Sequence, residues 1–410
     1  MHKTPVFFID TKKFKICFIN KFDWLGAAPM ATVSVQMSHA LATVGNDVTL
    51  YISGTTDLNS SEILESKYAL EKLHNLNLEI LSKSKFIKKN KISFYFYLKA
   101  FLHIIKKIRN CKEKLIIISR NTHFIPFMFL IKKITGAMTF FETHSFHNRA
   151  HKERKWLGVV PHFGTLQSWL FEKIFLPHLN GLICITRRQI RLYKLIAPSL
   201  PSVYLPLGSP KPEMLSPITV KSRNPTKLLY CGRLTPYLDV ITLIKALYLC
   251  KNSGVTLTWF GLSEKDKCTL ISFAKKFNVA DSIFAESWIS HKDLLKRMKT
   301  DFGIGLATYD SNFISSALTC PTKIFDYFAA GLPVIGSSIG TVKDILTNGR
   351  EGLLYIPEDS QSLHNCIEKI KNDKELYFTM QKNCLKSAER FSWINRARNF
   401  VSFVESCYGR

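Results

Sequence analysis

The chain has 410 residues, of which 46% are apolar and 21% are charged, and its formal net charge at pH 7 is +26. This composition excludes a disordered or fibrous chain, and the length exceeds that of an ordinary single domain, so we expect two or three domains, most simply two. The ten cysteines include no Cys-x-x-Cys pair. The sequence therefore indicates neither zinc nor disulfide exchange, and we expect free thiols in a reducing compartment.

The beginning of the chain does not resemble a signal peptide. Residues 1–13 contain the apolar patch VFFI, but Asp10 interrupts it and no small-residue cleavage site follows. The longest apolar run, residues 124–141, is interrupted by Lys132 and Lys133 and is too short to span a bilayer. We therefore expect a cytoplasmic protein without a membrane-spanning helix.

In the first half of the chain, short apolar runs alternate with segments of helical periodicity. This alternation predicts a parallel sheet that is covered by helices on both faces. The expected strands are residues 14–20, 47–53, 115–119, 138–144, 181–186 and 202–208.

Positive charge is concentrated in the same half. Residues 1–200 hold 30 Lys and Arg against 12 Asp and Glu, so 30 − 12 = +18 of the total of +26 lies there. The densest basic segment, residues 83–114, interleaves lysines with an aromatic cluster: Phe94, Tyr95, Phe96, Tyr97 and Phe101. This pattern favours contact with an anionic membrane surface; a nucleic-acid surface and a solvated helix face are the alternatives.

The second half repeats the alternation after a predicted linker. Residues 209–226 are rich in proline, serine and charge and lack periodicity. The strands expected after them are residues 227–232, 255–261, 281–286, 302–307, 332–338 and 352–356, and residues 361–408 are expected to be helical throughout. We therefore predict two doubly wound α/β domains, with the ligand site in a cleft at the carboxyl ends of their strands.

The segment PTKIFDYFAAGLPVIGSSIGT, residues 321–341, predicts a helix that begins at an anion site. Pro321 is tolerated in a first helical turn, and Thr319 or Cys320 is the expected cap. The free amides and the positive dipole end near Thr322 and Lys323 favour a phosphate group.

Asp326 lies on the same helix face, three residues after Lys323. Its carboxylate can accept two hydrogen bonds from a vicinal diol such as that of a ribose, so a nucleoside diphosphate fits this helix. The alternative is that Lys323 and Asp326 simply form an exposed ion pair.

The same segment resembles the donor-binding signature of the family 4 glycosyltransferases with the GT-B fold. Other segments are similar to further motifs of that family: residues 228–247, 258–267, 348–359 and 391–400, and in the first half 141–146, 184–193 and 203–209. The resemblance implies an acceptor-binding Rossmann-like domain (1–208), a linker (209–226), a nucleotide-sugar-binding Rossmann-like domain (227–388) and a closing helix that crosses back (389–410).

The resemblance also implies roles for individual residues. Asp326 takes the place of the ribose-binding acid, Arg233 after Gly232 binds the distal phosphate, and His144 lies near the sugar or the acceptor. The donor-binding set implied by the family pattern and by the helix start is Gly26, Gly232, Arg233, Gly261, Thr322, Lys323 and Asp326, and the catalytic set is His144, Arg233 and Lys323. Alanines at 27 and 28 replace the usual second glycine after Gly26.

Two departures from the family pattern change the expected chemistry. Tyr237 and Leu238 occupy the region of a family lysine, so we expect Lys323 to supply that charge. Leu318 replaces the first acidic residue of the signature. Backbone amides or the hydroxyl groups of Ser315, Ser316 or Thr319 are then expected to hold the donor sugar.

The resulting prediction is a retaining, hexosyltransferase-type enzyme that uses a nucleotide-sugar donor and a saccharide or lipid-linked acceptor in cell-surface polysaccharide or glycolipid synthesis. No Asp-x-Asp motif is present, so we expect neither a metal nor another cofactor. We expect it to act on the inner face of the cell membrane, as a peripheral protein that does not bind nucleic acid. The alternatives are a non-catalytic homologue, a sugar-nucleotide epimerase and a basic nucleic-acid-binding protein.

Overall fold

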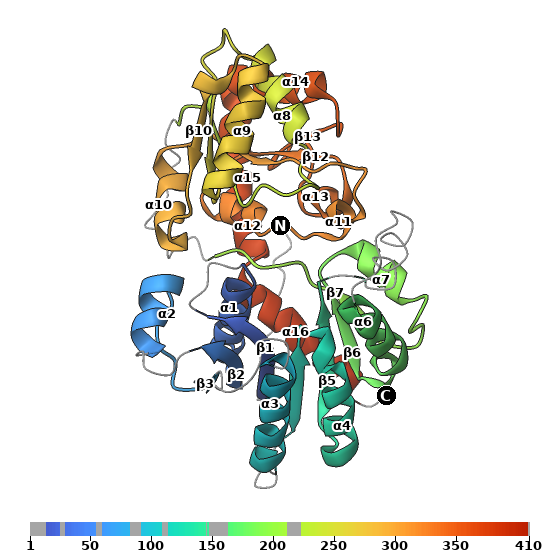
Figure 1. Ribbon diagram of the computed structural model, residues 1–410. Helices are drawn as coiled ribbons and strands as arrows, with labels where there is room; N and C mark the ends of the chain where they lie inside the picture. Colours follow the sequence, from blue (N-terminus) through green and yellow to red (C-terminus); the bar gives the residue numbers. More distant parts are fainter. Residues whose placement is uncertain are drawn as a thin grey trace, which may run out of the picture.

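The computed structural model describes residues 14–24, 29–54, 60–82, 92–108, 114–144, 146, 163–210 and 223–408. They form two α/β domains, and Figure 1 shows the N-terminal domain below the C-terminal one. Each domain is built on its own parallel sheet, so the predicted fold class is confirmed.

The N-terminal sheet has seven strands in the order β3-β2-β1-β4-β5-β6-β7, and every described pairing is parallel. Both of its faces are buried, because Ile16 and Phe18 of β1 pack into one apolar cluster and Cys17 and Ile19 into another. The strands are β1 (Lys15–Asp23), β2 (Asp47–Gly54), β3 (Leu76–Ser82), β4 (Leu115–Ser119), β5 (Met138–Thr143), β6 (Gly181–Cys184) and β7 (Ser202–Tyr204). The helices are α1 (Pro29–Thr43), α2 (Ser60–Tyr68), α3 (Ile92–Ile108), η1 (Thr122–Phe124), α4 (Ile125–Thr135), α6 (Phe163–Ile174), η2 (Leu176–His178) and α7 (Arg187–Tyr193).

The C-terminal sheet has six parallel strands in the order β10-β9-β8-β11-β12-β13. The chain order reverses between β8 and β11, which is the switch point where doubly wound sheets bind ligands. The strands are β8 (Lys227–Cys231), β9 (Thr256–Phe260), β10 (Ile283–Glu286), β11 (Ile304–Ala307), β12 (Val334–Ser337) and β13 (Gly352–Tyr355). The helices before β13 are α8 (Val240–Leu249), α9 (Glu264–Lys276), η4 (Ala280–Ser282), α10 (His291–Thr300), α11 (Ile314–Leu318), α12 (Thr322–Ala329) and α13 (Gly340–Ile345).

The prediction that residues 361–408 are helical is confirmed, apart from short breaks between the helices. Three helices occupy this range: α14 (Ser360–Asn372), α15 (Lys374–Arg390) and α16 (Trp393–Cys407). Asp373 and Ser392 interrupt it because each side chain accepts a hydrogen bond from the backbone three residues later and so caps a new helix.

Two chain segments connect the domains and lie against each other. Ser209 donates its amide to the carbonyl of Phe391 at 2.8 Å, and the amide of Trp393 bonds to Ser209 at 3.3 Å. A Cβ atom at Gly208 would lie 2.3 Å from the Trp393 ring, so only glycine fits there. We call residues 205–209 and 391–393 the crossing segments.

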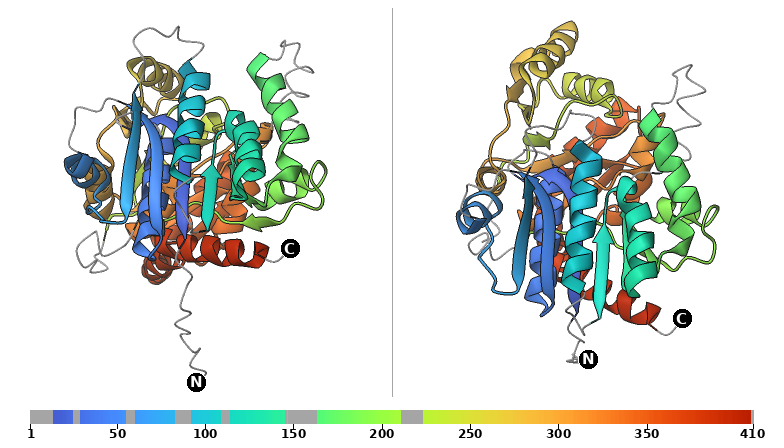
Figure 2. Two further views of the ribbon diagram at one scale, coloured as in Figure 1. Left: turned by 90° about the horizontal axis from the view of Figure 1, so that it is seen from below. Right: turned by 60° about the horizontal axis from the view of Figure 1, so that its bottom comes forward.

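Helix α16 follows the second crossing segment and packs on the N-terminal domain. Phe400 and Phe403 each place their ring 5.7 Å from the ring of Phe140 on β5. Figure 2 shows α16, in red, lying along the N-terminal sheet. No helix among the described residues is long and apolar enough to cross a membrane.

Candidate active site

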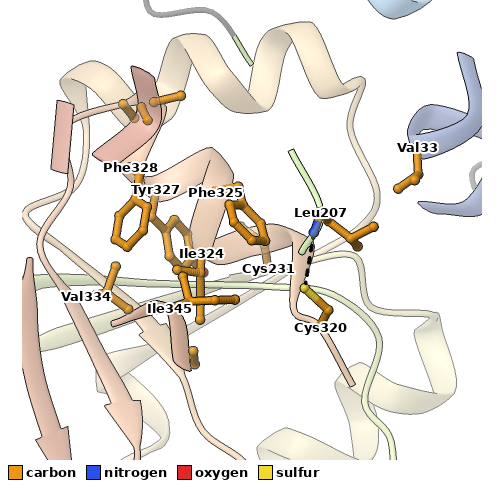
Figure 3. Close-up of a cluster of buried hydrophobic side chains, with 14 of the residues drawn as sticks. Val33, Leu207, Cys231, Cys320, Ile324, Phe325, Tyr327, Phe328, Val334 and Ile345 are labelled. Atoms are coloured by element: carbon orange, nitrogen blue, oxygen red, sulfur yellow. Dashed lines mark hydrogen bonds between the residues drawn. The ribbon is translucent and has the colours of Figure 1, made fainter. Parts of the chain in front are cut away.

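Helix α12 carries most of the predicted site. Its N-cap is Pro321, which has no side-chain acceptor, so the expectation of a cap by Thr319 or Cys320 was wrong. Both side chains are used elsewhere: Thr319 donates to the carbonyl of Ser315 at 2.7 Å, and the Cys320 sulfur accepts from the Leu207 amide at 3.5 Å (Figure 3). The first-turn amides therefore receive no side-chain cap.

One face of helix α12 packs into the hydrophobic core. Ile324, Phe325, Tyr327 and Phe328 are fully buried, and Figure 3 shows them in the cluster with Val334 and Ile345. The other face carries Thr322, Lys323 and Asp326, which are all partly buried. The spacing of the apolar residues thus fixes the direction in which the polar side chains point.

The ammonium group of Lys323 lies among aromatic rings. Its Nζ is 3.6 Å from the ring centroid of Tyr230 and 5.7 Å from that of Tyr309, and no carboxylate of a described residue lies within ion-pair distance. Burial lowers the pKa of Lys323 to about 7. The charge is therefore stabilised by ring faces, and it lacks the counter-ion that a buried cation normally needs.

Two glycines at strand ends border Lys323. Gly232 follows β8 with φ 128°, and a Cβ there would lie 3.5 Å from the Lys323 Nζ. Gly261 follows β9 with φ 96°, and a Cβ there would lie 3.4 Å from the backbone of Gly232. Arg233 directly follows Gly232 in the chain, is exposed, and has no hydrogen bond or ion pair to a described residue. The structure thus brings the predicted residues Gly232, Gly261 and Lys323 together.

Asp326 pairs with a histidine that the sequence did not single out. Its Oδ1 lies 3.0 Å from Nε2 of His291, the first residue of α10, so the alternative of a Lys323–Asp326 ion pair is wrong. Burial opposes a charge on His291, but the Asp326 carboxylate outweighs burial and raises the pKa of His291. The second carboxylate oxygen, Oδ2, is the one that this pair leaves for another ligand.

The loop before His291 adds an exposed aromatic ring to this region. Trp288 is 54% exposed, and the loop is attached to the glycine turn because the Gly261 amide bonds to the carbonyl of Ser287 at 3.4 Å. The signal that could have revealed the loop is Ser290-x-x-Asp293, a cap pattern directly after a predicted strand.

His144 lies at the end of β5 in a group of buried charges. Glu142 Oε1 is 3.0 Å from His144 Nε2 and 3.3 Å from Arg120 Nε, while Oε2 is 3.0 Å from Arg396 of α16. Arg120 also lies against the His144 imidazole. Its Nε is 2.5 Å from Nε2 of the histidine, and its Nη2 is 2.9 Å from Nδ1. His144 itself is 18% exposed.

The charges in this group set the protonation state of the histidine. Burial would raise the pKa of Glu142, but Arg396 and Arg120 outweigh burial and hold it well below its usual range. Burial, reinforced by the charge of Arg120, lowers the pKa of His144 to about 4 although Glu142 opposes this. His144 is therefore neutral at pH 7 and can accept or donate a hydrogen bond but carries no charge.

The two leucines that depart from the family pattern are core residues. Leu238 is 7% exposed within the C-terminal core, and Leu318 is 6% exposed and packs into an N-terminal apolar cluster. The Tyr237 ring stacks on that of Tyr309 at 6.3 Å. Ser316 is buried and bonds to the carbonyl of Tyr237, so Ser315 is the exposed hydroxyl of those considered for the sugar. Gly26, Ala27 and Ala28 lie outside the described residues.

Potential metal ligands gather elsewhere. Among the described residues, ligand atoms of Cys250, His364 and Glu368 lie within 4.8 Å of one another. Lys371 already occupies a cation position there, 2.6 Å from Glu368. This group belongs to the α8 and α14 region, which Figure 1 shows apart from α12.

Parallel sheets whose strands are connected by helices on both faces define the doubly wound class of α/β proteins. Residues 213–387 match the family described as "Glycosyl transferases group 1". A relative, sucrose-phosphate synthase 4 of Arabidopsis thaliana, is 36% identical over 100 residues, which are 24% of this chain and 10% of that protein. This chain thus matches only a small part of the length of that curated relative.

Solved structures match nearly the whole chain. Sucrose-phosphate synthase from Thermosynechococcus elongatus superposes with a TM-score of 0.71 at 16% identity, over 97% of this chain and 99% of that one. HepE of Anabaena, in complex with UDP-glucose, superposes with a TM-score of 0.68 at 14% identity, over 96% of this chain and 99% of that one. The match of residues 213–387 to the group 1 glycosyltransferase family agrees with the predicted family, and the likeness to these solved structures confirms the predicted GT-B fold.

Proposed function

We propose that this protein transfers a hexosyl group from a nucleoside-diphosphate sugar to a saccharide or lipid-linked acceptor, with retention of configuration, in cell-surface polysaccharide or glycolipid synthesis. The observation that carries the proposal is the position of Lys323, a partly buried cation beside Gly232 that has no carboxylate partner among the described residues. A diphosphate supplies the missing negative charge, and glycine at the strand end lets it approach the backbone closely.

The proposed chemistry is stabilisation of the leaving diphosphate. Negative charge grows on that group as the glycosidic bond to the donor breaks, so fixed positive charges lower the barrier. Lys323, the exposed Arg233 and the uncapped start of α12 provide this charge at one edge of the sheet. The free Oδ2 of Asp326 accepts from the ribose hydroxyl groups, and the Trp288 ring stacks on the base.

Retention follows, in this proposal, from attack on the face from which the leaving group departs. Glu142 is held by Arg120, Arg396 and His144, and this makes it a poor nucleophile. A phosphate oxygen of the leaving group then takes the proton of the acceptor hydroxyl. Neutral His144 acts as a hydrogen-bond partner of the donor sugar or the acceptor.

Calorimetry with UDP, GDP and ADP tests the donor site, and UDP comes first because it is the nucleotide named with HepE. We expect one nucleotide to bind the wild type and to bind Lys323→Ala at least about tenfold more weakly, because a charge-assisted contact is lost. Equal affinities for the two proteins would contradict the proposal. Nucleotide binding without turnover of any UDP-, GDP- or ADP-sugar would support the non-catalytic alternative that Leu238 and Leu318 suggest.

A basic and apolar face on the N-terminal domain supports a membrane-bound acceptor. It is formed by the adjacent helices α3, α4 and α6, which contain a single acidic residue, the buried Glu172. Its exposed residues, here called the docking face, are Phe94, Leu102, Lys106, Leu130, Lys133, Ile134, Leu170, Lys173 and Ile174. Exposed apolar side chains beside lysines complement an anionic lipid surface.

This face corrects one detail of the docking hypothesis. Phe96 and Tyr97 are 4% and 5% exposed and belong to the core, whereas Phe94 is 62% exposed. The physical reason is helical periodicity, since residues 96 and 97 fall on the inner face of α3. Residues 83–91 and 109–113 of the predicted basic segment lie outside the described residues.

Co-sedimentation with phosphatidylglycerol vesicles tests the docking face. Exchange of Lys106, Lys133 and Lys173 for glutamate should weaken binding by about 3 kcal/mol or more, since each basic residue contributes about 1 kcal/mol. The matched control is the same exchange at the exposed Lys265, Lys275 and Lys276 of α9, which should leave binding unchanged. Equal recovery on phosphatidylcholine vesicles, or a preference for a single-stranded oligonucleotide, would overturn the membrane proposal.

A further inference from the structure

The crossing segments end directly beside the buried charges around His144. Arg396 lies one turn into α16, four residues after Ser392, and is 4% exposed. Its Nε donates to the carbonyl of Pro206 at 2.8 Å and one terminal nitrogen donates to Leu205 at 3.3 Å. One side chain therefore connects the second crossing segment with the first.

The same guanidinium group contacts the carboxylate that holds the histidine. The terminal nitrogen that reaches Leu205 is 3.0 Å from Glu142 Oε2, and Glu142 Oε1 is 3.0 Å from His144 Nε2. A planar guanidinium with donors in a fixed fork suits this task, whereas a lysine could not make these contacts at once. The chain of contacts runs from the interdomain backbone to His144 in two steps.

The first crossing segment also contacts the start of α12, the helix that carries Lys323 and Asp326. Cys320, three residues before Lys323, bonds to the Leu207 amide of the first crossing segment. Burial raises the pKa of the Cys320 thiol, and Arg396, which lowers this pKa, and Glu142, which raises it, both lie close enough to affect it. Arg396 therefore lies where the C-terminal domain, the crossing segments and the histidine meet.

We propose that Arg396 is a positioning residue that couples the crossing segments between the domains to the orientation and protonation of His144, through Glu142. This inference rests on the proposed function for its catalytic consequence. A movement of the C-terminal domain that shifts Leu205 or Pro206 pulls on the guanidinium and so changes the contact of Glu142 with His144. The histidine is set for catalysis only in the domain arrangement that keeps these bonds.

The groups that face His144 decide how its titration depends on Arg396. They are Arg120 after β4, Glu142 on β5 and Arg396 on α16, with the Cys320 thiol nearby. Arg396 and Arg120 disfavour a charge on the imidazole and Glu142 favours it. Removal of the Arg396 charge should therefore raise the pKa of His144 above its value of about 4, and acid should protonate it at higher pH.

The experiment compares Arg396→Gln and Arg396→Lys with the control Arg398→Gln, a change at an exposed arginine on the same helix. NMR of imidazole-labelled protein follows the titration of His144, which is assigned by loss of its signal in His144→Gln. We expect Arg396→Gln to raise the pKa of His144 by about one unit and to lower kcat about tenfold, with donor KM within about twofold, as the histidine is misplaced. Arg396→Lys should keep the low pKa, and Arg398→Gln should change neither quantity.

A double-mutant cycle keeps the inference testable if Arg396→Gln does not fold. Arg396→Lys should lower kcat about fivefold in the wild-type background and have no further effect in His144→Gln, because coupled residues are not additive. An equal loss in both backgrounds, or a wild-type titration in Arg396→Gln, would overturn the inference. If no donor is turned over by the wild type, the proposed function fails, and the NMR titration still decides whether Arg396 controls His144.

Discussion

Lys323 and Arg396 are both enclosed cations, but their surroundings differ. Arg396 is bonded to a carboxylate and to two backbone carbonyl groups, so its charge has fixed partners within the protein. Lys323 faces tyrosine rings and a glycine, and burial lowers its pKa to about 7. The arginine charge is therefore constant and structural, whereas we expect the lysine charge to respond to an anion that binds beside it.

The largest effect is expected when the carboxylate between Arg120 and Arg396 is removed. Glu142→Gln leaves Arg120 and Arg396 without their common counter-ion, so the free energy of unfolding should fall by about 3 to 5 kcal/mol. Urea unfolding measures it, and Glu65→Gln, at an exposed position on α2, should change it by less than about 0.5 kcal/mol. A loss below about 1 kcal/mol for Glu142→Gln would mean that this group is not held together by charge.

The next largest effect is expected at Lys323, the cation without a carboxylate partner among the described residues. Lys323→Ala should lower kcat/KM about 10²-fold or more, a loss near 3 kcal/mol, because a charge that stabilises the leaving diphosphate is removed. Steady-state release of the nucleotide measures it, with Lys296→Ala at an exposed position of α10 as the control. Activity within about threefold of the wild type would exclude Lys323 from the reaction.

A smaller effect is expected at Asp326. Asp326→Asn should weaken the Kd for the nucleoside diphosphate by about 1 to 3 kcal/mol, since the ribose hydroxyl groups lose a charged acceptor. Calorimetry measures it, and Asp301→Asn, at a carboxylate paired with Arg297 on the far end of α10, is the control. An unchanged Kd would leave Asp326 with a structural role as the partner of His291.

The smallest effect is a pH dependence that separates the two cations directly. The pKa of Lys323 is lowered in the free protein to about 7 and rises when an anion binds, so binding takes up a proton. Affinity for the nucleotide should then be highest below pH 7 and should fall about fivefold from pH 7 to pH 8 as the free lysine loses its proton. Lys323→Arg should abolish this dependence, and a pH-independent Kd in the wild type would contradict the assigned pKa.

The sheets could be predicted from the sequence because buried parallel strands are continuous apolar runs. The strand β3 was missed because LNLEILS, at the edge of its sheet, mixes polar residues with apolar ones. The glycine turns could be predicted because each glycine directly follows a strand, and Lys323 because it lies in the first turn of a helix. The contacts between residues far apart in the chain could not be predicted. His291 and Asp326 are 35 residues apart, and Arg396 bonds to a carbonyl 190 residues away. Nothing local in the sequence indicates such partners.

The packing of α16 on the N-terminal domain has a consequence for synthesis on the ribosome. Phe400 and Phe403 cover Phe140, and Arg396 neutralises Glu142, so the first domain lacks part of its core and one counter-ion until the last helix is made. About 190 residues separate the end of β7 from the start of α16, which at 5–20 residues per second is a delay of roughly 10 to 40 s. During that interval the nascent domain exposes an apolar strip beside a carboxylate that lacks one of its two arginine partners, and chaperones that hold nascent chains have a defined surface to protect.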